Sequence, residues 1–349
     1  MPKDRSHKVS LGDVAKAAGV SKATASMVLR NSPGPSEQTR QKVLRVAKEQ
    51  EYIPDARIAS LMAMVKDAAS KDLVPLAWLD TNWEKDAWET YAFLSPYLEG
   101  ARARALELGY RIDRIWAREP GMSMRRISKI IYQRGIEGVI VTPGAKHARL
   151  EWERLASVAL ESSFLAPVLH RVMTDVTFNL LLALKMLKRH GYVRIGICMD
   201  RLVGRGSYNA CLAAAHYFHA SLPAVEVIPI LIYRRGKGTS WDENLNPISS
   251  WLKKQKPDVV VGHDNSLVRI VESSGYRVPE EVGVVHIATD DDVKDWAGID
   301  SKRRETGAFA AEWVISLLQN RRFGVPGTAI TTTIRGAWHN GRTLLVPKG

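Results

Sequence analysis

Hydrophobic and polar positions change their period along the chain, and this change divides the chain into regions. From about residue 74 onward, short runs rich in β-branched and aromatic residues alternate with longer stretches whose apolar positions recur at helical spacing. The strand-like runs cover residues 74–79, 111–116, 138–142, 193–199, 225–232, 258–262 and 282–287. The helical stretches cover residues 94–108, 124–134, 176–190, 208–218, 245–256, 267–274 and 308–320. Such alternation predicts an α/β fold of parallel sheets with helices on both faces, and its length predicts two lobes.

The first 53 residues follow a different pattern, which predicts a small all-α domain. Three short helices are expected, over residues 11–18, 22–30 and 37–51. Each follows a serine that is suited to cap a helix N-terminus: Ser10, Ser21 and Ser36. Asp13 lies three residues after the first of these caps, as in a capping box, and Gly19 ends the first helix.

Residues 54–71 include an apolar segment for which the sequence pattern predicts no neighbouring element to pack against. Its sequence, ARIASLMAMVK over residues 56–66, is helical by propensity and apolar nearly all round. Such a helix has no core of its own to cover, so it needs a partner. We therefore expect a linker at 54–71 between an N-terminal domain at 1–53 and a larger domain at 72–349.

Charge adds an expectation about partners. The chain of 349 residues carries 50 Lys and Arg against 37 Asp and Glu, a formal net charge of +13. Residues 1–60 alone hold 11 basic and 6 acidic side chains. An excess of this size favours a polyanionic partner such as nucleic acid.

Composition argues against several other classes of protein. A hydrophobic content of 45% is too high for a disordered chain. The start shows no apolar segment of a signal peptide, no run reaches 18 apolar residues, and two cysteines cannot form a disulfide framework. We therefore expect a cytoplasmic protein.

The strongest motif, VSLGDVAKAAGVSKATASMVL, covers residues 9–29. Two short helices joined by a tight turn at Gly19 predict a helix-turn-helix. In this motif the start of the second helix enters the major groove of DNA, and small polar side chains bond to phosphates. The alternative, an ordinary helical hairpin with a basic face, fits the spacing, position and charge less well.

These residues resemble the start of the LacI/GalR family of bacterial transcription regulators. The matching residues are Ser10, Asp13-Val14-Ala15, Ala18-Gly19-Val20-Ser21, Thr24-Ala25-Ser26, Val28-Leu29, Pro35-Ser36, Thr39-Arg40, Lys42-Val43, Tyr52, Pro54, Ala59 and Leu61. The resemblance implies DNA contacts by Ser10, Ser21, Lys22, Ala23, Thr24, Ser26, Met27, Arg30, Asn31, Ser36, Thr39, Arg57, Ile58 and Leu61. It also implies that residues 54–71 form a hinge helix, which pairs across a homodimer and inserts Leu61 into the minor groove.

Three positions depart from the family pattern. Met27 stands where many members have an Arg or His that reads a base edge, Arg30 replaces the usual Asn, and Asp55 replaces the Asn after the proline. A methionine can contact a thymine methyl but cannot make the bidentate contact of arginine with guanine. The operator sequence is therefore not predicted from common family sites.

For residues 72–349 the resemblance implies a type I periplasmic-binding-protein fold, in which two α/β lobes enclose a ligand cleft. Residues 191–197 and 275–285 match family landmarks, whereas His286-Ile287-Ala288-Thr289 replaces the usual G-F-D-D. We expect lobe 1 at about 72–172 and 299–328, and lobe 2 at about 173–298 and 329–349.

Ligands of open α/β sheets bind outside the carboxyl ends of the strands. This rule and the matches to family effector positions give the candidate effector residues: Asp80, Trp83, Thr142, Arg201, Arg205, Asp264 and Trp296. Arg201 and Arg205 are alternatives for one role, because the local alignment is ambiguous. Carboxylates and guanidinium groups suit sugar hydroxyls, and an aromatic ring suits the apolar face of a sugar. The family likewise implies a carbohydrate effector.

Other classes of protein fit less well. No G-x-S-x-G, P-loop or H-E-x-x-H motif points to an enzyme, and we expect no cofactor. His216 and His219, with Cys211 or Asp200, offer a metal site, but such histidines more often lie on an ordinary helix face, and we expect no metal. A free solute-binding protein would lack the helix-turn-helix, and a nucleoid protein would not need the cleft.

We therefore expect a transcriptional regulator, in the first instance a repressor, whose operator affinity depends on a small-molecule effector. A single helix-turn-helix buries too little surface for tight specific binding, so we expect a homodimer on a pseudo-palindromic site in double-stranded DNA. The last residues, 345–349, contain no leucine-rich helix that would add tetramer contacts. Whether the ligand releases DNA or favours its binding stays open.

Overall fold

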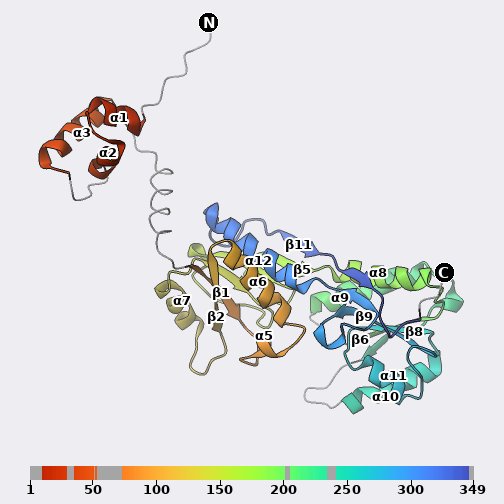
Figure 1. Ribbon diagram of the computed structural model, residues 1–349. Coiled ribbons are helices and arrows are strands. Elements are labelled where there is room, and N and C mark those ends of the chain that lie inside the picture. The colour runs from red at the N-terminus through yellow and green to blue at the C-terminus, as the bar shows by residue number, and fades with distance from the viewer. Residues whose placement is uncertain are drawn as a thin grey trace, which may run out of the picture. The chain divides into compact units, whose positions relative to one another are not determined.

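The computed structural model describes residues 10–29, 35–50, 52, 73–200, 205–233 and 241–345. The chain divides into two units, Met1–Asp72 and Leu73–Gly349, which are described separately (Figure 1). The predicted hinge segment, with Arg57, Ile58 and Leu61, lies outside the described residues, as do Arg30, Asn31 and Arg201.

Three helices make up the described part of the first unit: α1 (Leu11–Ala17), α2 (Lys22–Leu29) and α3 (Glu37–Glu49). The predicted serine caps are confirmed. The Ser10 hydroxyl accepts the backbone N–H of Asp13 at 3.3 Å while the Asp13 carboxylate accepts the Ser10 N–H at 2.9 Å, which is a complete capping box. Ser21 and Ser36 each accept the backbone N–H three residues later, at 3.0 and 3.3 Å.

The helices of this unit enclose a small apolar core. Its buried members are Val14, Ala15, Ala18, Ala25, Val28, Val43, Val46 and Ala47. Gly19 has a φ of +65° in the turn between α1 and α2, a backbone conformation that favours glycine. The small alanines let α1 and α2 approach closely, and the turn fixes their mutual angle, so the motif is rigid.

The second unit contains two six-stranded sheets, one in each lobe. The lobe 1 sheet has the order β11-β5-β4-β3-β1-β2, and all its strands are parallel. Its strands are β1 (Val74–Asp80), β2 (Tyr110–Trp116), β3 (Gly138–Val141), β4 (Ala156–Leu160), β5 (His170–Thr174) and β11 (Thr331–Ile334). Its helices are α5 (Ala87–Thr90), α6 (Ser95–Glu107), α7 (Met124–Gln133), α12 (Arg303–Gln319) and a 3-10 turn at Trp152–Arg154.

The lobe 2 sheet has the order β12-β10-β9-β8-β6-β7, in which only the edge strand β12 is antiparallel. Its strands are β6 (Ile195–Asp200), β7 (Leu231–Tyr233), β8 (Val259–Gly262), β9 (Gly283–Thr289), β10 (Gly298–Asp300) and β12 (Ala337–His339). Its helices are α8 (Val176–Arg189), α9 (Arg205–Ala220), α10 (Trp241–Gln255), α11 (Leu267–Ser273) and 3-10 turns at Ala224–Glu226 and Asp291–Val293.

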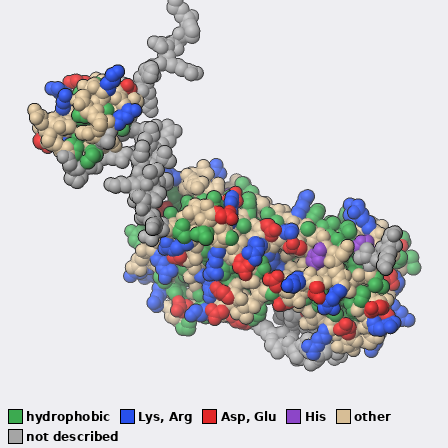
Figure 2. Space-filling model, in the orientation of Figure 1, with side chains coloured by type: hydrophobic (Ala, Val, Ile, Leu, Met, Phe, Trp, Pro, Cys, Tyr) green, Lys and Arg blue, Asp and Glu red, His purple; other side chains and the backbone are tan. Residues whose placement is uncertain are grey.

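Helices cover both faces of each sheet, as the alternation of strands and helices predicted. In lobe 1, Leu76 and Trp78 of β1 pack with α6 and α12, which lie side by side in Figure 1, whereas Ala77 and Leu79 pack with α7. In lobe 2, α8 and α9 cover one face and α10 and α11 the other. On the visible face of this larger unit, Lys and Arg side chains are spread among Asp and Glu (Figure 2).

Three connections cross between the lobes, and each lies a few residues later than we expected. Strand β5 runs to Thr174 in the lobe 1 sheet, past the expected boundary at 172. Strand β10 belongs to lobe 2 through Asp300, and β11 pairs with β5 in lobe 1 although we had placed residues 329–349 in lobe 2. These strands are short, and β11 reads TTTI, so their pattern did not mark them as strands.

The strands predicted from the sequence pattern were partly wrong and partly incomplete. The expected strand over 225–232 is a 3-10 turn followed by the three-residue strand β7. Strands β4, β5, β10, β11 and β12 were not predicted. Strand β4 is fully buried, but its sequence, ASVAL, is small and without strong alternation, so periodicity alone did not reveal it.

Candidate functional site

The start of α2 presents the small polar surface that the helix-turn-helix motif predicted. Ser21 and Lys22 are exposed, Thr24 and Ser26 are partly exposed, and the Met27 side chain is 40% exposed. The Ser21 and Thr24 hydroxyls bond to each other at 2.9 Å, so both are held at the helix N-terminus. Helix N-termini carry a partial positive charge and free N–H groups, which suit phosphate.

The start of α3 repeats this arrangement. Ser36 is exposed, and its hydroxyl bonds to the Thr39 hydroxyl at 2.9 Å. The expected contact residue Ser10 is exposed as the cap of α1. Ala23 lies on α2, but its side chain is outside the described part of the structure. All described DNA candidates with a described side chain are therefore accessible, and their contacts with DNA stay a prediction.

A cavity of about 670 Å³ lies between the two lobes of the second unit, within the usual size range of ligand pockets. Its lobe 2 wall comes from the ends of β6, β8 and β9 and from α8 and α9. Its lobe 1 wall comes from the ends of β4 and β5 and from residues 91–97 before and in α6. The carboxyl ends of parallel strands thus face the cavity in both lobes, as the strand-end rule predicts.

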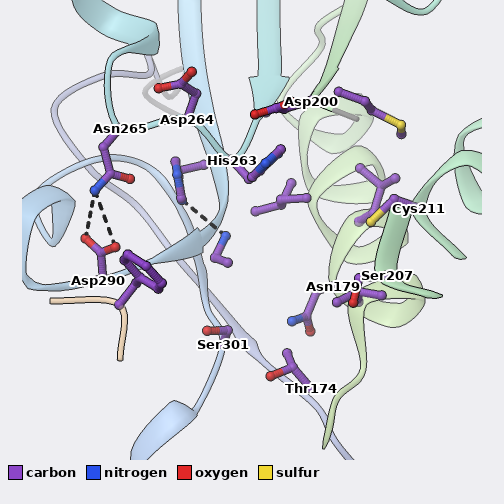
Figure 3. Close-up of a pocket in the computed structure, with 18 of the residues that line it drawn as sticks. Thr174, Asn179, Asp200, Ser207, Cys211, His263, Asp264, Asn265, Asp290 and Ser301 are labelled. Atoms are coloured by element: carbon purple, nitrogen blue, oxygen red, sulfur yellow. Dashed lines mark hydrogen bonds between the residues drawn. The ribbon is translucent and has the colours of Figure 1, made fainter. Parts of the chain in front are cut away.

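Asp200, Asp264 and Asp290 place carboxylates on a lobe 2 wall that is otherwise largely apolar. Asp264 is buried; its Oδ1 accepts the Ser266 N–H at 2.8 Å and its Oδ2 accepts the Tyr233 hydroxyl at 3.2 Å. Asp290 accepts the Asn265 side-chain amide at 3.2 Å, and Asp200 lies at the end of β6. Figure 3 shows Asp200, Asp264 and Asp290 around one end of the cavity. Such acceptors suit a ligand rich in hydroxyl groups.

His286 adds a neutral polar group to this wall. It is buried at the point where β9 faces the cavity, and its Nδ1 accepts the Ala288 N–H at 3.2 Å. Burial, with the nearby His263 and Arg303, lowers its pKa to about 3. The imidazole is therefore neutral at physiological pH, and since Nδ1 accepts, its proton is on Nε2.

Glu161 is the carboxylate of the lobe 1 wall. It follows β4, and its Oε1 accepts three hydrogen bonds: from the Tyr97 hydroxyl at 2.8 Å, and from the Thr174 N–H and hydroxyl at 3.1 and 2.9 Å. Burial raises the pKa of Glu161 above its usual value, and the three donors oppose this. Both donor residues also line the cavity.

Besides the Nε2 of His286, two cavity residues carry buried polar atoms that have no hydrogen-bond partner in the described part of the chain. They are the Nδ2 of Asn179 on α8 and the Oγ of Ser301 after β10, and each residue is 1% exposed. Figure 3 shows both with Thr174 at the end of the cavity away from Asp200 and Asp264. A buried polar group without a partner costs about 1–3 kcal/mol, so these atoms mark a place for ligand or water.

Polar contacts join the lobes beside the cavity. Arg303, at the start of α12, donates to the carbonyl oxygens of Thr289 and Ala288 at 3.1 and 3.0 Å. The hydroxyls of Ser162 and Ser207, one from each lobe, lie 3.2 Å apart.

The structure places the candidate effector residues in different environments. Asp264 lines the cavity, and its ligand role stays a prediction. Arg201 lies outside the described residues, and the side chain of Arg205, at the start of α9, is not described.

Four candidates do not line this cavity, so their effector role stays a prediction that the cavity does not support: Asp80, Trp83, Thr142 and Trp296. The Asp80 carboxylate is buried and accepts the Trp88 indole N–H at 2.9 Å. The Thr142 hydroxyl donates to the Leu79 carbonyl, Trp83 packs under the Arg118 guanidinium at 3.5 Å, and Trp296 belongs to the lobe 2 core. The strand-end rule locates strand ends, but it does not say which side chains turn inward.

Sequence reasoning missed Glu161, Asn179 and Ser301. Glu161 follows β4, which was not predicted, whereas Asn179 and Ser301 lie close to predicted lobe crossings without a motif that marks them. Within the described part of the chain, no group of three or more His, Cys, Asp or Glu side chains is arranged to hold a metal ion. Nor does any helix there have the length and apolar character needed to cross a membrane.

A three-helix unit with a helix-turn-helix, followed by two parallel-sheet lobes around a polar cavity, defines the class of this protein. The family model described as "Bacterial regulatory proteins, lacI family" matches residues 10–55. The sucrose operon repressor of Vibrio alginolyticus is 41% identical over 69 residues, which are 18% of this chain and 73% of that protein. The chain therefore belongs to the lacI family of bacterial regulatory proteins.

Likeness to other members is more remote. The HTH-type transcriptional regulator MalR of Streptococcus pneumoniae serotype 4 is 29% identical over 132 residues, so the match spans 38% of either chain. The solved structure of the transcriptional regulator CelR–cellobiose complex has a TM-score of 0.59 and 16% identity, and covers 96% of this chain and 99% of that one. The fold class expected from the sequence, a helix-turn-helix domain followed by a periplasmic-binding-protein-like domain, is confirmed.

Proposed function

We propose that this protein is a transcriptional repressor whose affinity for operator DNA is set by a carbohydrate bound between its two lobes. The observation that carries the proposal is the cavity of about 670 Å³, which is lined by carboxylates and contains unpartnered polar atoms of Asn179 and Ser301. It occurs in a chain whose other unit presents exposed helix N-termini with serine caps. One unit is thus suited to phosphate and the other to a polyhydroxy ligand.

The similar proteins support both halves of the proposal. One relative is named a sucrose operon repressor, and one structural neighbour is described as a complex with cellobiose. Sugar hydroxyls both donate and accept hydrogen bonds, so the carboxylates can accept from them while the Asn179 amide donates to them. We expect no enzymatic turnover of the ligand.

On DNA we propose a homodimer on two half-sites, with phosphate contacts from Ser10, Ser21, Ser36 and Thr39. Base-edge contacts come from the exposed face of α2, where Met27 contacts a thymine methyl. Leu61, with Arg57 and Ile58, forms the minor-groove hinge. Ligand binding changes the closure of the two lobes, and the differential affinity of the ligand for the two states sets the coupling, typically about 1–3 kcal/mol.

Selection of bound sequences from a random duplex DNA library, using the full chain, tests the DNA half. The expected result is enrichment of a pseudo-palindromic site. Lys22→Ala should weaken binding of that site, whereas Lys48→Ala, which removes an exposed lysine from the last turn of α3, should weaken it less. Failure to enrich any sequence would exclude a sequence-specific regulator.

The ligand half is tested by titrating the selected site in the presence of cellobiose, sucrose, maltose or ribose. At least one of these sugars, or a close analogue, should change operator affinity between about 5-fold and 150-fold. A sugar that binds without changing operator affinity would contradict the coupling and leave the DNA half standing.

A further inference from the structure

Glu161 combines three features that no structural role requires together. It faces the ligand cavity, its carboxyl group lies deep between the lobes, and its backbone has a φ of +58°. A non-glycine residue rarely adopts this left-handed region, and such residues cluster at functional sites. Arg171 donates to the Glu161 carbonyl oxygen and helps to hold the corner in place.

The two oxygens of the Glu161 carboxylate differ in their surroundings. Oε1 accepts all three of the hydrogen bonds to this side chain, from Tyr97 and Thr174. No described donor bonds to Oε2, although the side chain is only partly exposed and faces the cavity. A carboxylate oxygen has two lone-pair sites, so Oε2 is a fixed acceptor that has no partner among the described residues.

The cluster around Oε1 also fixes the direction of Oε2. Tyr97 is on α6 and Thr174 ends β5, so the carboxylate is held from two elements of lobe 1. The Tyr97 and Thr174 hydroxyls lie 3.3 Å apart, which keeps the three donors together. A group whose rotamer is locked in this way is pre-organised for binding, because little side-chain entropy remains to be lost.

We propose that Glu161 is the effector contact of lobe 1, and that its Oε2 accepts a hydrogen bond from a hydroxyl or ammonium group of the effector. The inference rests on the proposed function and adds a specific residue and ligand chemistry to it. The lobe 2 wall offers Asp264 as a second acceptor. An effector with a hydrogen-bond donor toward each of these carboxylates therefore links the two lobes.

Two variants separate a ligand contact from a structural role. Glu161→Gln keeps a carbonyl oxygen that accepts the three hydrogen bonds, but it replaces Oε2 by an amide group that cannot accept. Glu161→Gly removes the side chain and suits the left-handed backbone, so it should fold. Glu137→Gln is the matched control, because Glu137 is an exposed glutamate of the same lobe that does not line the cavity.

The measurement is isothermal titration of the full-length protein with whichever of cellobiose, sucrose, maltose or ribose raises the wild-type melting temperature most, and then with its monodeoxy derivatives. Glu161→Gln should weaken binding of the parent sugar by about tenfold or more, since a hydrogen bond to a charged group is worth about this much. Glu161→Gly should weaken it at least as much, and Glu137→Gln should leave it unchanged.

For the wild type, one monodeoxy derivative should bind about tenfold more weakly than the parent sugar. For Glu161→Gln, the same derivative and the parent sugar should bind equally tightly, because removing the sugar hydroxyl and replacing Oε2 abolish the same hydrogen bond. If Glu161→Gln binds the parent sugar like the wild type, Glu161 is not a contact while the proposed function stands. Equal losses in Glu137→Gln and Glu161→Gln would also refute the contact. If no sugar binds the wild type, the carbohydrate effector is wrong, and the proposed contact fails with it.

Discussion

Strand ends face the cavity in both lobes, but in lobe 2 they belong to three neighbouring strands and carry acidic side chains, whereas in lobe 1 they belong to β4 and β5 and the acidic side chain follows β4 in a backbone corner. Asp200 and Asp264 lie at or just after the carboxyl ends of β6 and β8, and His286 lies in β9. Glu161 faces them from lobe 1 through a left-handed turn. One wall thus follows from regular sheet geometry, while the other depends on a single strained residue and its hydrogen bonds.

This difference suggests separate tasks for the two lobes. The lobe 2 groups are parts of a sheet buried on both faces, so they are positioned before ligand arrives. The lobe 1 group is held by Tyr97, whose helix in turn depends on close packing against α12. Substitutions in lobe 2 should therefore affect ligand affinity directly, and substitutions in the α6–α12 contact should affect the stability and placement of the lobe 1 wall.

The largest effect is expected from Asp264→Ala. The carboxylate can accept two hydroxyl hydrogen bonds from a ligand, and each bond to a charged group is worth about 1.5–3 kcal/mol. Effector affinity should fall at least a hundredfold and the effector response of operator binding should disappear, whereas ligand-free operator affinity should stay within about twofold of wild type. Fluorescence anisotropy with labelled operator, with and without the sugar, measures both.

The control for this variant is Asp291→Ala, which removes an exposed carboxylate of lobe 2 that does not line the cavity. It should keep the full response. If the sugar changed the operator affinity of Asp264→Ala as it does that of the wild type, Asp264 would not belong to the effector site. The proposed difference between the two lobe walls would then be wrong.

The second prediction concerns the packing that places Tyr97. Gly307 of α12 lies so close to α6 that an added Cβ would be 1.9 Å from the Tyr97 carbonyl oxygen, and Gly100 of α6 is equally close to the Arg304 carbonyl oxygen. Since both carbonyl oxygens belong to the backbone, the helices must move apart. Gly307→Ala should lower the free energy of unfolding by about 3 kcal/mol and weaken effector binding as well.

Chemical denaturation of the full chain checks this prediction. Gly327→Ala serves as control, because a Cβ there meets no atom within 4 Å and the residue also belongs to the connection before β11 in lobe 1. If Gly307→Ala were as stable as wild type, the contact between α6 and α12 would be looser than the structure shows, and the proposed support of the lobe 1 wall would be wrong.

The sequence predicted the parts of the molecule that local rules determine. The serine caps at Ser10, Ser21 and Ser36 follow from short-range hydrogen bonds, and the fold class follows from the alternation of strands and helices. Asp264 could be proposed because it follows a clear strand. Asp80 equally follows β1, yet it turns inward to the Trp88 indole, and this choice depends on packing that one sequence does not reveal.

The lobe 1 wall could not be predicted for a related reason. Glu161 faces the cavity from a backbone position with positive φ, and the local sequence ALESS, residues 159–163, does not specify that conformation. Its supporting residues, Tyr97 and Thr174, are 64 and 13 positions away in the sequence. Trp296 likewise suited a sugar ring by its type, but the surrounding apolar residues place it in the lobe 2 core, where it packs edge-on against His286.

The smallest effect is a pH dependence that should have opposite signs in the two lobes. In lobe 2, the His286 pKa of about 3 lies below the unfolded value near 6.5, so the unfolded state binds its proton first as the pH falls. The stability that neutral His286 contributes is complete above pH 6.5 and is lost progressively toward pH 3. Between pH 7 and pH 5 the loss should reach about 2 kcal/mol.

In lobe 1, Glu161 acts in the other direction. Because burial raises its pKa above the unfolded value, the folded state keeps its proton longer as the pH rises, so this group lowers stability with increasing pH. Denaturation of His286→Gln between pH 7 and pH 5 should therefore show a smaller loss on acidification than wild type, while Glu161→Gln should show a larger one. His216→Gln, an exposed position on α9, should follow the wild type. If the free energy of unfolding changed with pH by the same amount in all four proteins, neither His286 nor Glu161 would be held in the protonation state that its burial implies. The two walls would then not differ in their electrostatics.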